Sequence, residues 1–259
     1  MALDFVVPGR ALVRAPVAPM YAEPHVTSIQ VSQRVCGHEV ELLEEQEDWY
    51  WARGTDAYEG WVHRGFLSPT PAAGARGSRQ IPRISLGCVT TLPDGGTRAL
   101  PLGALLSPAE SVKFGEVVPE TELRARFPTA TIPITKSALR YFEGTSYLWG
   151  GITPWGADCS GFAQTIFGLH GVPLPRDAWL QSETGEDAGA LDELRAADLA
   201  FFTDRDDLRV AHVAIALGGR RLVHLALGRG GFAIETLTDA RDAYVGKLRT
   251  RFLRARRVL

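Results

Sequence analysis

The sequence predicts an α+β protein in which one or two small all-β barrels precede a domain of mixed helices and strands. Short segments in which apolar and polar residues alternate, bounded by turn residues, fill the N-terminal half. In the C-terminal half, apolar residues at helical spacing are followed by a run of strand-like segments. Of the 259 residues, 45% are hydrophobic and 22% are charged, as in ordinary globular proteins. We therefore expect a barrel at 1–70, a linker at 71–80, a second, degenerate barrel at 81–128 and the mixed domain at 129–259.

The first barrel is predicted from short strand-like segments at 11–14, 30–35, 39–44, 49–53 and 60–63. Their order and aromatic content resemble bacterial SH3-like domains. The residues that carry this resemblance are Gly37-His-Glu-Val-Glu-Leu-Leu-Glu, Asp48-Trp-Tyr-Trp-Ala-Arg and Tyr58-Glu-Gly-Trp-Val. Aromatic side chains dominate the cores of small domains, so simple core packing is the expected role of Trp49, Trp51 and Trp61.

A domain boundary is predicted at 69–78, where Pro, Ala and Gly accumulate. After it, residues 84–92, the turn at 93–96 and residues 97–100 have the pattern of a β-hairpin, which suggests a second SH3-like barrel. Cys88 alternates with apolar neighbours in the first of these strands and is expected in a core.

Net charge and cysteine spacing exclude several classes of protein. The formal net charge is −2 and there is no run of basic residues, so neither nucleic acid nor an anionic membrane is an expected partner. Cys36, Cys88 and Cys159 are widely separated and form no C-x-x-C pair, which argues against a disulfide framework and a zinc site. We expect no metal or cofactor.

The sequence as given also lacks the patterns of a membrane or secreted protein. Its first residues show neither a basic leader nor a small-residue cleavage site. No segment approaches the roughly 18 consecutive apolar residues of a transmembrane helix. A cytoplasmic protein is therefore expected.

One stretch delivers a cysteine to the start of a helix. A helix is predicted at 129–143, then a Gly-rich loop, and then apolar residues at helical spacing from Phe162 to Leu169. Cys159 falls in the first turn, where unpaired N–H groups and the helix dipole favour a thiolate. Ser160 and Gly161 are expected to let a substrate approach the backbone. The alternative is a buried structural cysteine.

Two histidines lie on a predicted hairpin. The strands at 210–217 and 221–227 are joined by Gly218-Gly-Arg220. With a three-residue loop, position 212 faces position 226 and lies diagonal to position 224, so both histidines share one face. A two-residue loop would place them on opposite faces. A nucleophilic cysteine needs an imidazole, and the imidazole needs a third group to orient it.

These residues together resemble the NlpC-type family of papain-like murein peptidases. The resemblance covers roughly the last half of the chain. It is carried in order by Tyr147-Leu-Trp-Gly-Gly, Asp158-Cys-Ser-Gly-Phe, Leu174-Pro-Arg-Asp, Ala211-His-Val and His224. It implies a papain-like catalytic domain with Cys159, His212 and His224 as the catalytic residues.

Relatives with N-terminal SH3-like domains imply a finer expectation. They cleave the γ-D-glutamyl–L-diamino acid bond of murein peptides, with diaminopimelate or lysine as the diamino acid, and the recycling subset requires a free N-terminal L-alanine. The expected partners are therefore small murein peptides. A bound ammonium must be paired, so carboxylates and a phenol should line one end of the cleft. The expected substrate-binding residues are Glu23, Tyr58, Tyr147, Asp158, Ser160 and Asp177.

Two other functions remain open from the sequence. The first is a secreted peptidoglycan hydrolase of the same chemistry that acts on intact wall, with its SH3-like domains bound to the polymer. The second is a non-catalytic wall-peptide binding module in which Cys159 is inert.

Overall fold

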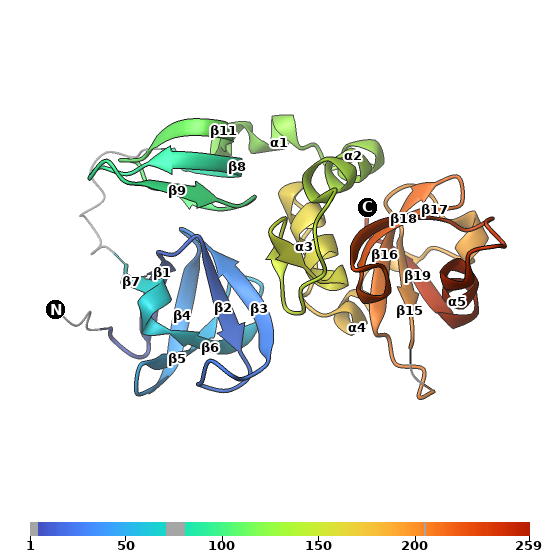
Figure 1. The fold of residues 1–259 in the computed structure, drawn as a ribbon, viewed down its shortest axis with the longest axis horizontal. Coiled ribbons are helices and arrows are strands. Elements are labelled where there is room, and N and C mark those ends of the chain that lie inside the picture. Colours follow the sequence, from blue (N-terminus) through green and yellow to red (C-terminus); the bar gives the residue numbers. More distant parts are fainter. Residues whose placement is uncertain (1–4, 71–80, 205) are drawn as a thin grey trace. The chain divides into compact units, whose positions relative to one another are not determined.

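A computed structural model describes residues 5–70, 81–204 and 206–259 (Figure 1). The chain forms two compact units, Met1–Leu123 and Arg124–Leu259. The first unit is built mainly of strands, and the second combines helices with a sheet. The α+β prediction is thus confirmed. The linker predicted at 71–80 lies outside the described residues.

A seven-stranded antiparallel sheet curls around the first core, in the order β3-β2-β6-β5-β4-β1-β7. Apolar side chains such as Met20, Leu42 and Val62 point into this core and are fully buried. All five predicted strand segments are strands in the structure, which adds β2 and β7 to them. The bounds are β1 (Gly9–Val13), β2 (Val17–Tyr21), β3 (Gln30–Val35), β4 (Glu39–Gln46), β5 (Trp49–Arg53), β6 (Glu59–His63) and β7 (Leu67–Pro69), with the short helix η1 (Arg64–Phe66) between the last two.

The three tryptophans of this sheet differ in burial. Trp49 is buried, as core packing predicts. Trp51 and Trp61 face each other across the β5–β6 pair, edge to face, with ring centroids 5.5 Å apart. Both are only half-buried, so they form an aromatic pair on the partly exposed side of the sheet.

A second, four-stranded sheet follows in the same unit. Strand β8 pairs with each of the others, and Thr91 lies opposite Thr97, which confirms the predicted hairpin. Cys88 is buried, as expected. Whether these strands form a degenerate SH3-like barrel stays a prediction. The bounds are β8 (Arg83–Thr91), β9 (Thr97–Leu100), β10 (Leu105–Leu106) and β11 (Ser111–Pro119), followed by η2 (Glu120–Glu122).

The second unit begins with helices and ends with a six-stranded antiparallel sheet in the order β14-β19-β15-β16-β17-β18. Of the helices in the described residues, none is long and apolar enough to cross a membrane. The bounds are α1 (Leu123–Arg126), α2 (Thr131–Phe142), β12 (Ile152–Thr153), β13 (Gly156–Ala157), α3 (Cys159–Leu169), α4 (Ala178–Gln181), β14 (Glu186–Asp187), η3 (Leu191–Glu193), β15 (Leu199–Phe202), β16 (His212–Gly218), β17 (Arg221–Ala226), η4 (Leu227–Arg229), β18 (Gly231–Thr236), α5 (Ala243–Arg251) and β19 (Phe252–Arg257).

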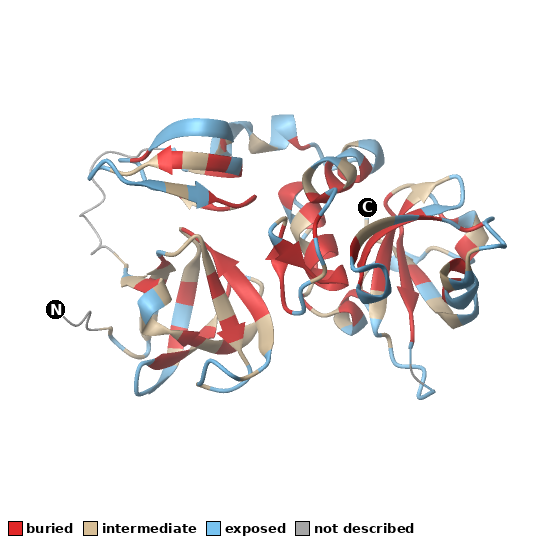
Figure 2. Ribbon diagram, in the orientation of Figure 1, coloured by how far each residue is buried: buried red, intermediate tan, exposed pale blue. Residues whose placement is uncertain are grey.

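Helix α3 and the middle strands of this sheet form the buried centre of the second unit (Figure 2). The helix contacts both β16 and β17. Phe162 on α3 packs edge to face on Phe142 at the end of α2, with ring centroids 4.9 Å apart. Burying two such rings stabilises the contact between the helices by more than their area alone. This contact packs the N-terminal half of α3 against the end of α2.

The second unit starts before the predicted boundary at 128/129. Arg124 donates to the carbonyl of Leu169 at 3.1 Å, and the hydroxyl of Thr129 donates to the carbonyl of His170. The ring of Phe127 packs on that of His170. These contacts join residues 124–129 to the C-terminal end of α3. His170 itself is buried and hydrogen bonded at both ring nitrogens, as expected for a core histidine.

Candidate active site

Cys159 occupies the first position of α3. The preceding residue, Asp158, is in extended conformation and its carboxylate accepts the amide N–H of Gly161 at 2.7 Å, a standard helix N-cap. Cys159 is 6% exposed, and its thiol accepts a hydrogen bond from the amide of Val213, the neighbour of His212. The prediction that this cysteine begins a helix is confirmed, and the contact joins α3 to the start of β16.

Gly161 is required by packing of the chain on itself. A Cβ atom built at Gly161 would lie 2.1 Å from the carbonyl oxygen of Gly151, and one at Gly151 would lie 2.3 Å from the carbonyl oxygen of Gly156. Such contacts are impossible without a backbone shift. We expected Gly161 to admit a substrate. The expectation was wrong, because the space next to Gly161 is filled by the loop that precedes the helix.

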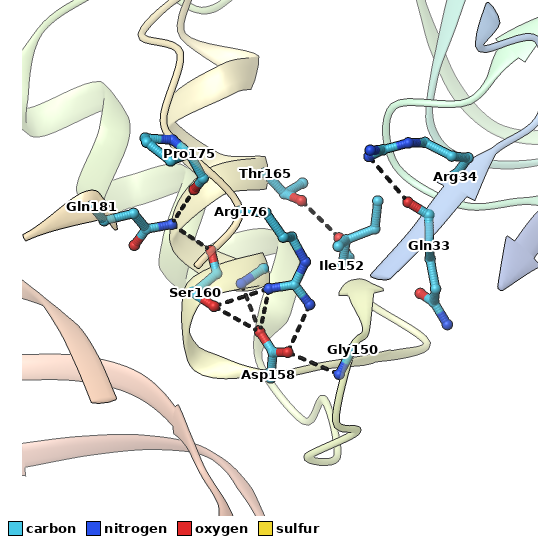
Figure 3. A network of polar contacts seen from close by, with 11 residues as sticks. Gln33, Arg34, Gly150, Ile152, Asp158, Ser160, Thr165, Pro175, Arg176 and Gln181 are labelled. Atoms are coloured by element: carbon cyan, nitrogen blue, oxygen red, sulfur yellow. Dashed lines mark hydrogen bonds and ion pairs between the residues drawn. The ribbon is translucent and has the colours of Figure 1, made fainter. Parts of the chain in front are cut away.

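Asp158 is the centre of a buried polar network (Figure 3). Arg176 donates to both of its carboxylate oxygens, at 3.0 and 2.7 Å, and also to the hydroxyl of Ser160 at 2.9 Å. The amide of Gly150 donates to the same carboxylate at 2.9 Å. Arg176 is 2% exposed. This charged residue of the 174–177 loop is therefore buried and paired with a buried carboxylate.

This network gives Asp158 and Ser160 clear structural partners. The hydroxyl of Ser160 donates to Asp158, and its carbonyl accepts the side-chain amide of Gln181 from α4 at 3.0 Å. Gln181 also donates to the carbonyl of Pro175. The segment after α3 is therefore tied to the turn that carries Cys159. Substrate binding by Asp158 and Ser160 stays a prediction.

The β16–β17 hairpin brings the two predicted histidines together. Ile215 lies opposite Val223, and the register shift between Ala216 and Gly218 leaves Leu217 as an extra residue. Position 212 therefore corresponds to position 226, the register expected for a three-residue loop. The loop itself is shorter than expected, because Gly218 pairs with Arg221 and only Gly219 and Arg220 lie between the strands, so Leu217 supplies the extra residue. Nε2 of His212 lies 2.8 Å from Nδ1 of His224. The prediction that both side chains share one face of the sheet is confirmed.

A third strand adds a carboxylate that the sequence analysis missed. Strand β18 pairs with β17, and Oε1 of Glu235 lies 3.2 Å from Nε2 of His224. Both side chains are buried, with exposed fractions of 0% for His224 and 3% for Glu235. A lone acidic residue in the apolar 232–237 strand was the available signal. It became informative only with the strand order.

Glu235 is in turn held by Arg229 of the short helix η4. The guanidinium donates to both carboxylate oxygens at 2.8 Å and also reaches Asp242, the N-cap of α5. Hydrogen bonds from His224 and Arg229 lower the pKa of Glu235 to about 2, against its burial, so it is ionised at neutral pH.

The electrostatics of the site correct one expectation. Burial raises the pKa of the Cys159 thiol to about 12, with the Asp158 carboxylate adding to the effect and the amides of Val213 and Ser160 opposing it. Burial and His224 together hold the pKa of His212 well below its usual value. The free protein therefore holds a neutral thiol and a neutral imidazole, whereas we had expected the helix N-terminus to favour a thiolate.

Two further predicted site residues belong to the second unit. Tyr147 is half-buried, and burial, with the Asp158 carboxylate adding to the effect, raises the pKa of its phenol. Asp177 is half-buried at the start of α4, where its side chain makes no capping hydrogen bond. Substrate binding by either residue stays a prediction.

The remaining predicted residues, Glu23 and Tyr58, belong to the first unit. Tyr21 lies opposite Trp61 in the antiparallel β2–β6 pair, so the segments just after β2 and just before β6 meet at one end of the sheet. Glu23 is exposed there and contacts His25 at 2.9 Å, and Tyr58 is half-buried. The structure thus places both at the same end of the first sheet, and their role stays a prediction.

Comparisons with known families match both units. Residues 144–250 match the NlpC/P60 family, and residues 20–65 match the bacterial dipeptidyl-peptidase SH3 domain. The first of these segments contains Cys159, His212, His224 and Glu235.

Two relatives and one solved structure illustrate what the chain is similar to in sequence and in fold. The chain is 38% identical to γ-D-glutamyl-L-lysine dipeptidyl-peptidase of Bacillus subtilis, over 42% of this chain and 36% of that protein. It is 28% identical to dipeptidyl-peptidase 6 of Lysinibacillus sphaericus, over 93% of this chain and 96% of that one. The crystal structure of an NlpC/P60 family protein from Bacillus cereus superposes with a TM-score of 0.80 at 19% identity, over 97% of this chain and 100% of that one. The chain therefore combines an NlpC/P60-family domain with a bacterial SH3 domain of the dipeptidyl-peptidase type.

Proposed function

We propose that this protein is a cysteine peptidase that hydrolyses the γ-D-glutamyl–L-diamino acid bond of murein peptides with a free N-terminal L-alanine. The observation that carries the proposal is the meeting of three elements in the second unit. Cys159 starts α3 and accepts the amide of Val213, while His212 at the start of β16 lies 2.8 Å from His224. A thiol, an imidazole and an orienting group are the parts that covalent catalysis by cysteine requires.

The chemistry follows from the protonation states. Because thiol and imidazole are both neutral at rest, His212 removes the proton from Cys159 as the sulfur attacks the carbonyl carbon of the γ-D-glutamyl bond. The oxygen of the resulting tetrahedral intermediate carries a negative charge. The N–H of Cys159, in the first turn of α3, is suited to stabilise it.

The second half of the reaction returns the proton. The imidazolium of His212 protonates the nitrogen of the leaving diamino acid, the carbon–nitrogen bond breaks, and a thioester links Cys159 to the γ-carboxyl of D-glutamate. Water deprotonated by His212 then attacks the thioester, which releases the dipeptide and restores the thiol. His224 holds His212 in orientation throughout.

The names of the relatives support the bond and the direction of cleavage. Two are γ-D-glutamyl-L-lysine dipeptidyl-peptidases, from Bacillus subtilis and Bacillus cereus, and a third is a dipeptidyl-peptidase. A dipeptidyl-peptidase removes two residues from a free N-terminus. Other similar proteins are named as murein endopeptidases, such as the Escherichia coli protein at 34% identity over 46% of this chain. Together these names support a peptidase of cell-wall peptides.

Recognition of a free N-terminus needs groups that pair with an ammonium. Asp177 of the second unit is the proposed partner, since a desolvated ammonium must be paired and hydrogen bonded. Such a requirement selects short free peptides over intact wall. We therefore include recycling of murein peptides in the cytoplasm in the proposal.

The test is mass spectrometry of the products formed from L-Ala-γ-D-Glu-L-Lys, from its diaminopimelate counterpart and from the N-acetylated forms of both. We expect L-Ala-D-Glu and the free diamino acid from the unmodified peptides only. Cys159→Ala should abolish the reaction, while Cys88→Ala, which alters a buried thiol of the first unit, should retain it.

Other results would change the assignment. Equal cleavage of the acetylated peptides would contradict recognition of the N-terminal ammonium. Release of peptides from intact sacculi would favour the wall hydrolase. If none of the peptides is cleaved by the folded protein, the peptidase proposal fails.

A further inference from the structure

A continuous line of polar contacts extends from His212, the proposed general base, to a partly exposed arginine of the second unit. It passes through His224 on β17 and Glu235 on β18 to Arg229 on η4. We propose that Glu235, held by Arg229, is a positioning residue that fixes the tautomers of both histidines and leaves Nδ1 of His212 as the proton acceptor for Cys159. This inference rests on the proposed cysteine peptidase chemistry.

The tautomers follow from donor and acceptor counting. An ionised carboxylate can only accept hydrogen bonds, so Nε2 of His224, 3.2 Å from Glu235, must carry the proton. With both rings neutral, Nδ1 of His224 is then an acceptor. The nitrogen that faces it at 2.8 Å, Nε2 of His212, must therefore be a donor. The lone pair of His212 is left on Nδ1.

The carboxylate is fixed in place as well as ionised. Arg229 donates to both oxygens of Glu235 at 2.8 Å, and planar two-point contacts of this kind set orientation as well as charge. Arg229 also pairs with Asp242, which caps α5 through the amides of Tyr244 and Val245. The orientation of Glu235 thus depends on η4 and on the start of α5, both far from Cys159 in sequence.

Three elements packed against His224 each direct one side chain toward its imidazole. His212 faces it from β16, Glu235 from β18, and the ring of Tyr244 from α5 at a centroid distance of 5.9 Å. Arg229 lies behind Glu235 and over the ring of Tyr244. When His212 takes the proton of Cys159, it becomes an imidazolium. Glu235, which contacts His212 through His224, is the first negative charge in this series of contacts. Its removal should therefore make the imidazolium harder to form.

The direct test is nitrogen-15 NMR of the wild-type protein labelled in histidine, at about pH 8. The two ring nitrogens of a neutral imidazole differ strongly in chemical shift according to which one carries the proton. We expect protonated Nε2 and unprotonated Nδ1 in both His212 and His224, with signals assigned from the His212→Gln and His224→Gln variants. A proton on Nδ1 of either histidine would overturn the proposal. The result is independent of whether the protein cleaves any peptide.

The kinetic test uses Glu235→Gln. Arg229 donates to both carboxylate oxygens of Glu235, and the glutamine amide replaces one of them with NH₂, so this NH₂ group must face at least one donor. We expect kcat to fall roughly a hundredfold with KM changed less than about twofold. Loss of the negative charge makes the imidazolium of His212 harder to form, so the acidic limb of the kcat/KM profile should move to lower pH.

A matched control separates positioning from simple destabilisation. Asp198 is a buried carboxylate in the same unit, and it receives a two-point contact from Arg257 at 2.8 and 2.7 Å. None of its described contacts involves a histidine. Asp198→Asn should leave the acidic limb where it is in wild type. If both variants shift the limb equally, or neither does, Glu235 has only a structural role. If Glu235→Gln does not fold, the NMR result on wild type decides.

Discussion

Arg176 donates two hydrogen bonds to Asp158, the residue directly before Cys159, at 3.0 and 2.7 Å. The same carboxylate caps α3 through Gly161 and holds the loop through Gly150. One buried ion pair therefore fixes the start of the helix, the loop before it and the segment after it. The position of the thiol depends on all three.

Loss of this ion pair should be strongly destabilising. Arg176→Met leaves the Asp158 carboxylate buried and without its guanidinium, a situation that costs about 3–5 kcal/mol in other proteins. The control is Arg249→Met, which breaks the exposed pair with Asp192. Exposed pairs contribute about 0–1 kcal/mol. Chemical denaturation of both variants measures the difference, and equal losses would contradict the assigned role of Arg176.

The two glycines of α3 should respond in opposite ways to alanine. In Gly161→Ala the new methyl group would lie 2.1 Å from the carbonyl oxygen of Gly151, so we expect loss of stability and of hydrolysis. Gly168→Ala meets nothing within 4 Å and should stabilise the helix by about 0.5–1 kcal/mol. Thermal melts and peptide cleavage assays provide the check. An active, stable Gly161→Ala protein would show that the loop and helix are not in close contact.

Alkylation of Cys159 should depend steeply on pH. Burial raises the pKa of its thiol to about 12, so the reactive thiolate is scarce at neutral pH. We expect the rate of iodoacetamide modification to rise about tenfold per pH unit between pH 6 and 9. Mass spectrometry of the peptide that contains Cys159 measures the rate. A plateau that begins below pH 7 would instead indicate a preformed thiolate–imidazolium pair.

Glu235 should contribute to stability in a defined pH window. Its pKa is lowered from 4.5 to about 2 in the folded protein, so its ionisation stabilises the fold above pH 4.5. This stabilisation is lost as the pH falls from 4.5 to 2. Glu235→Gln cannot lose it, so the stability difference between wild type and variant should narrow over that window. Denaturation curves at pH 6, 4 and 3 test this, and a constant difference would contradict the lowered pKa.

Local sequence patterns predicted much of the candidate site. The loop glycines and helical spacing placed Cys159 at the start of α3, and the count of residues in the 212–226 hairpin brought His212 and His224 to one face. Both inferences depend on contacts close in sequence. The spacing of apolar residues and the residue types of the turns determine such contacts.

The missed features depend on tertiary order. Strand β2 was missed because it contains Pro19, and proline in a segment argues against a strand. In the structure β2 pairs with β3 along its length and with β6 only at Tyr21. Helix α5 has no clear apolar face, and its better signals were the cap Asp242 and the basic residues of its last turn. The role of Glu235 required knowledge that β18 lies next to β17.

Leu217 is the residue of this hairpin that can be lost without changing any strand pair. Without it, the pairs Ala216–Leu222 and Gly218–Arg221 would simply follow each other, and His212 would stay on the face of His224. Removing Ala214 from the paired part would instead move His212 by one position and turn it to the opposite face. Deletions should therefore be tolerated at 217 and rejected between His212 and Ala216, so a deletion library across 212–220 would show a sharp boundary in function at the bulge.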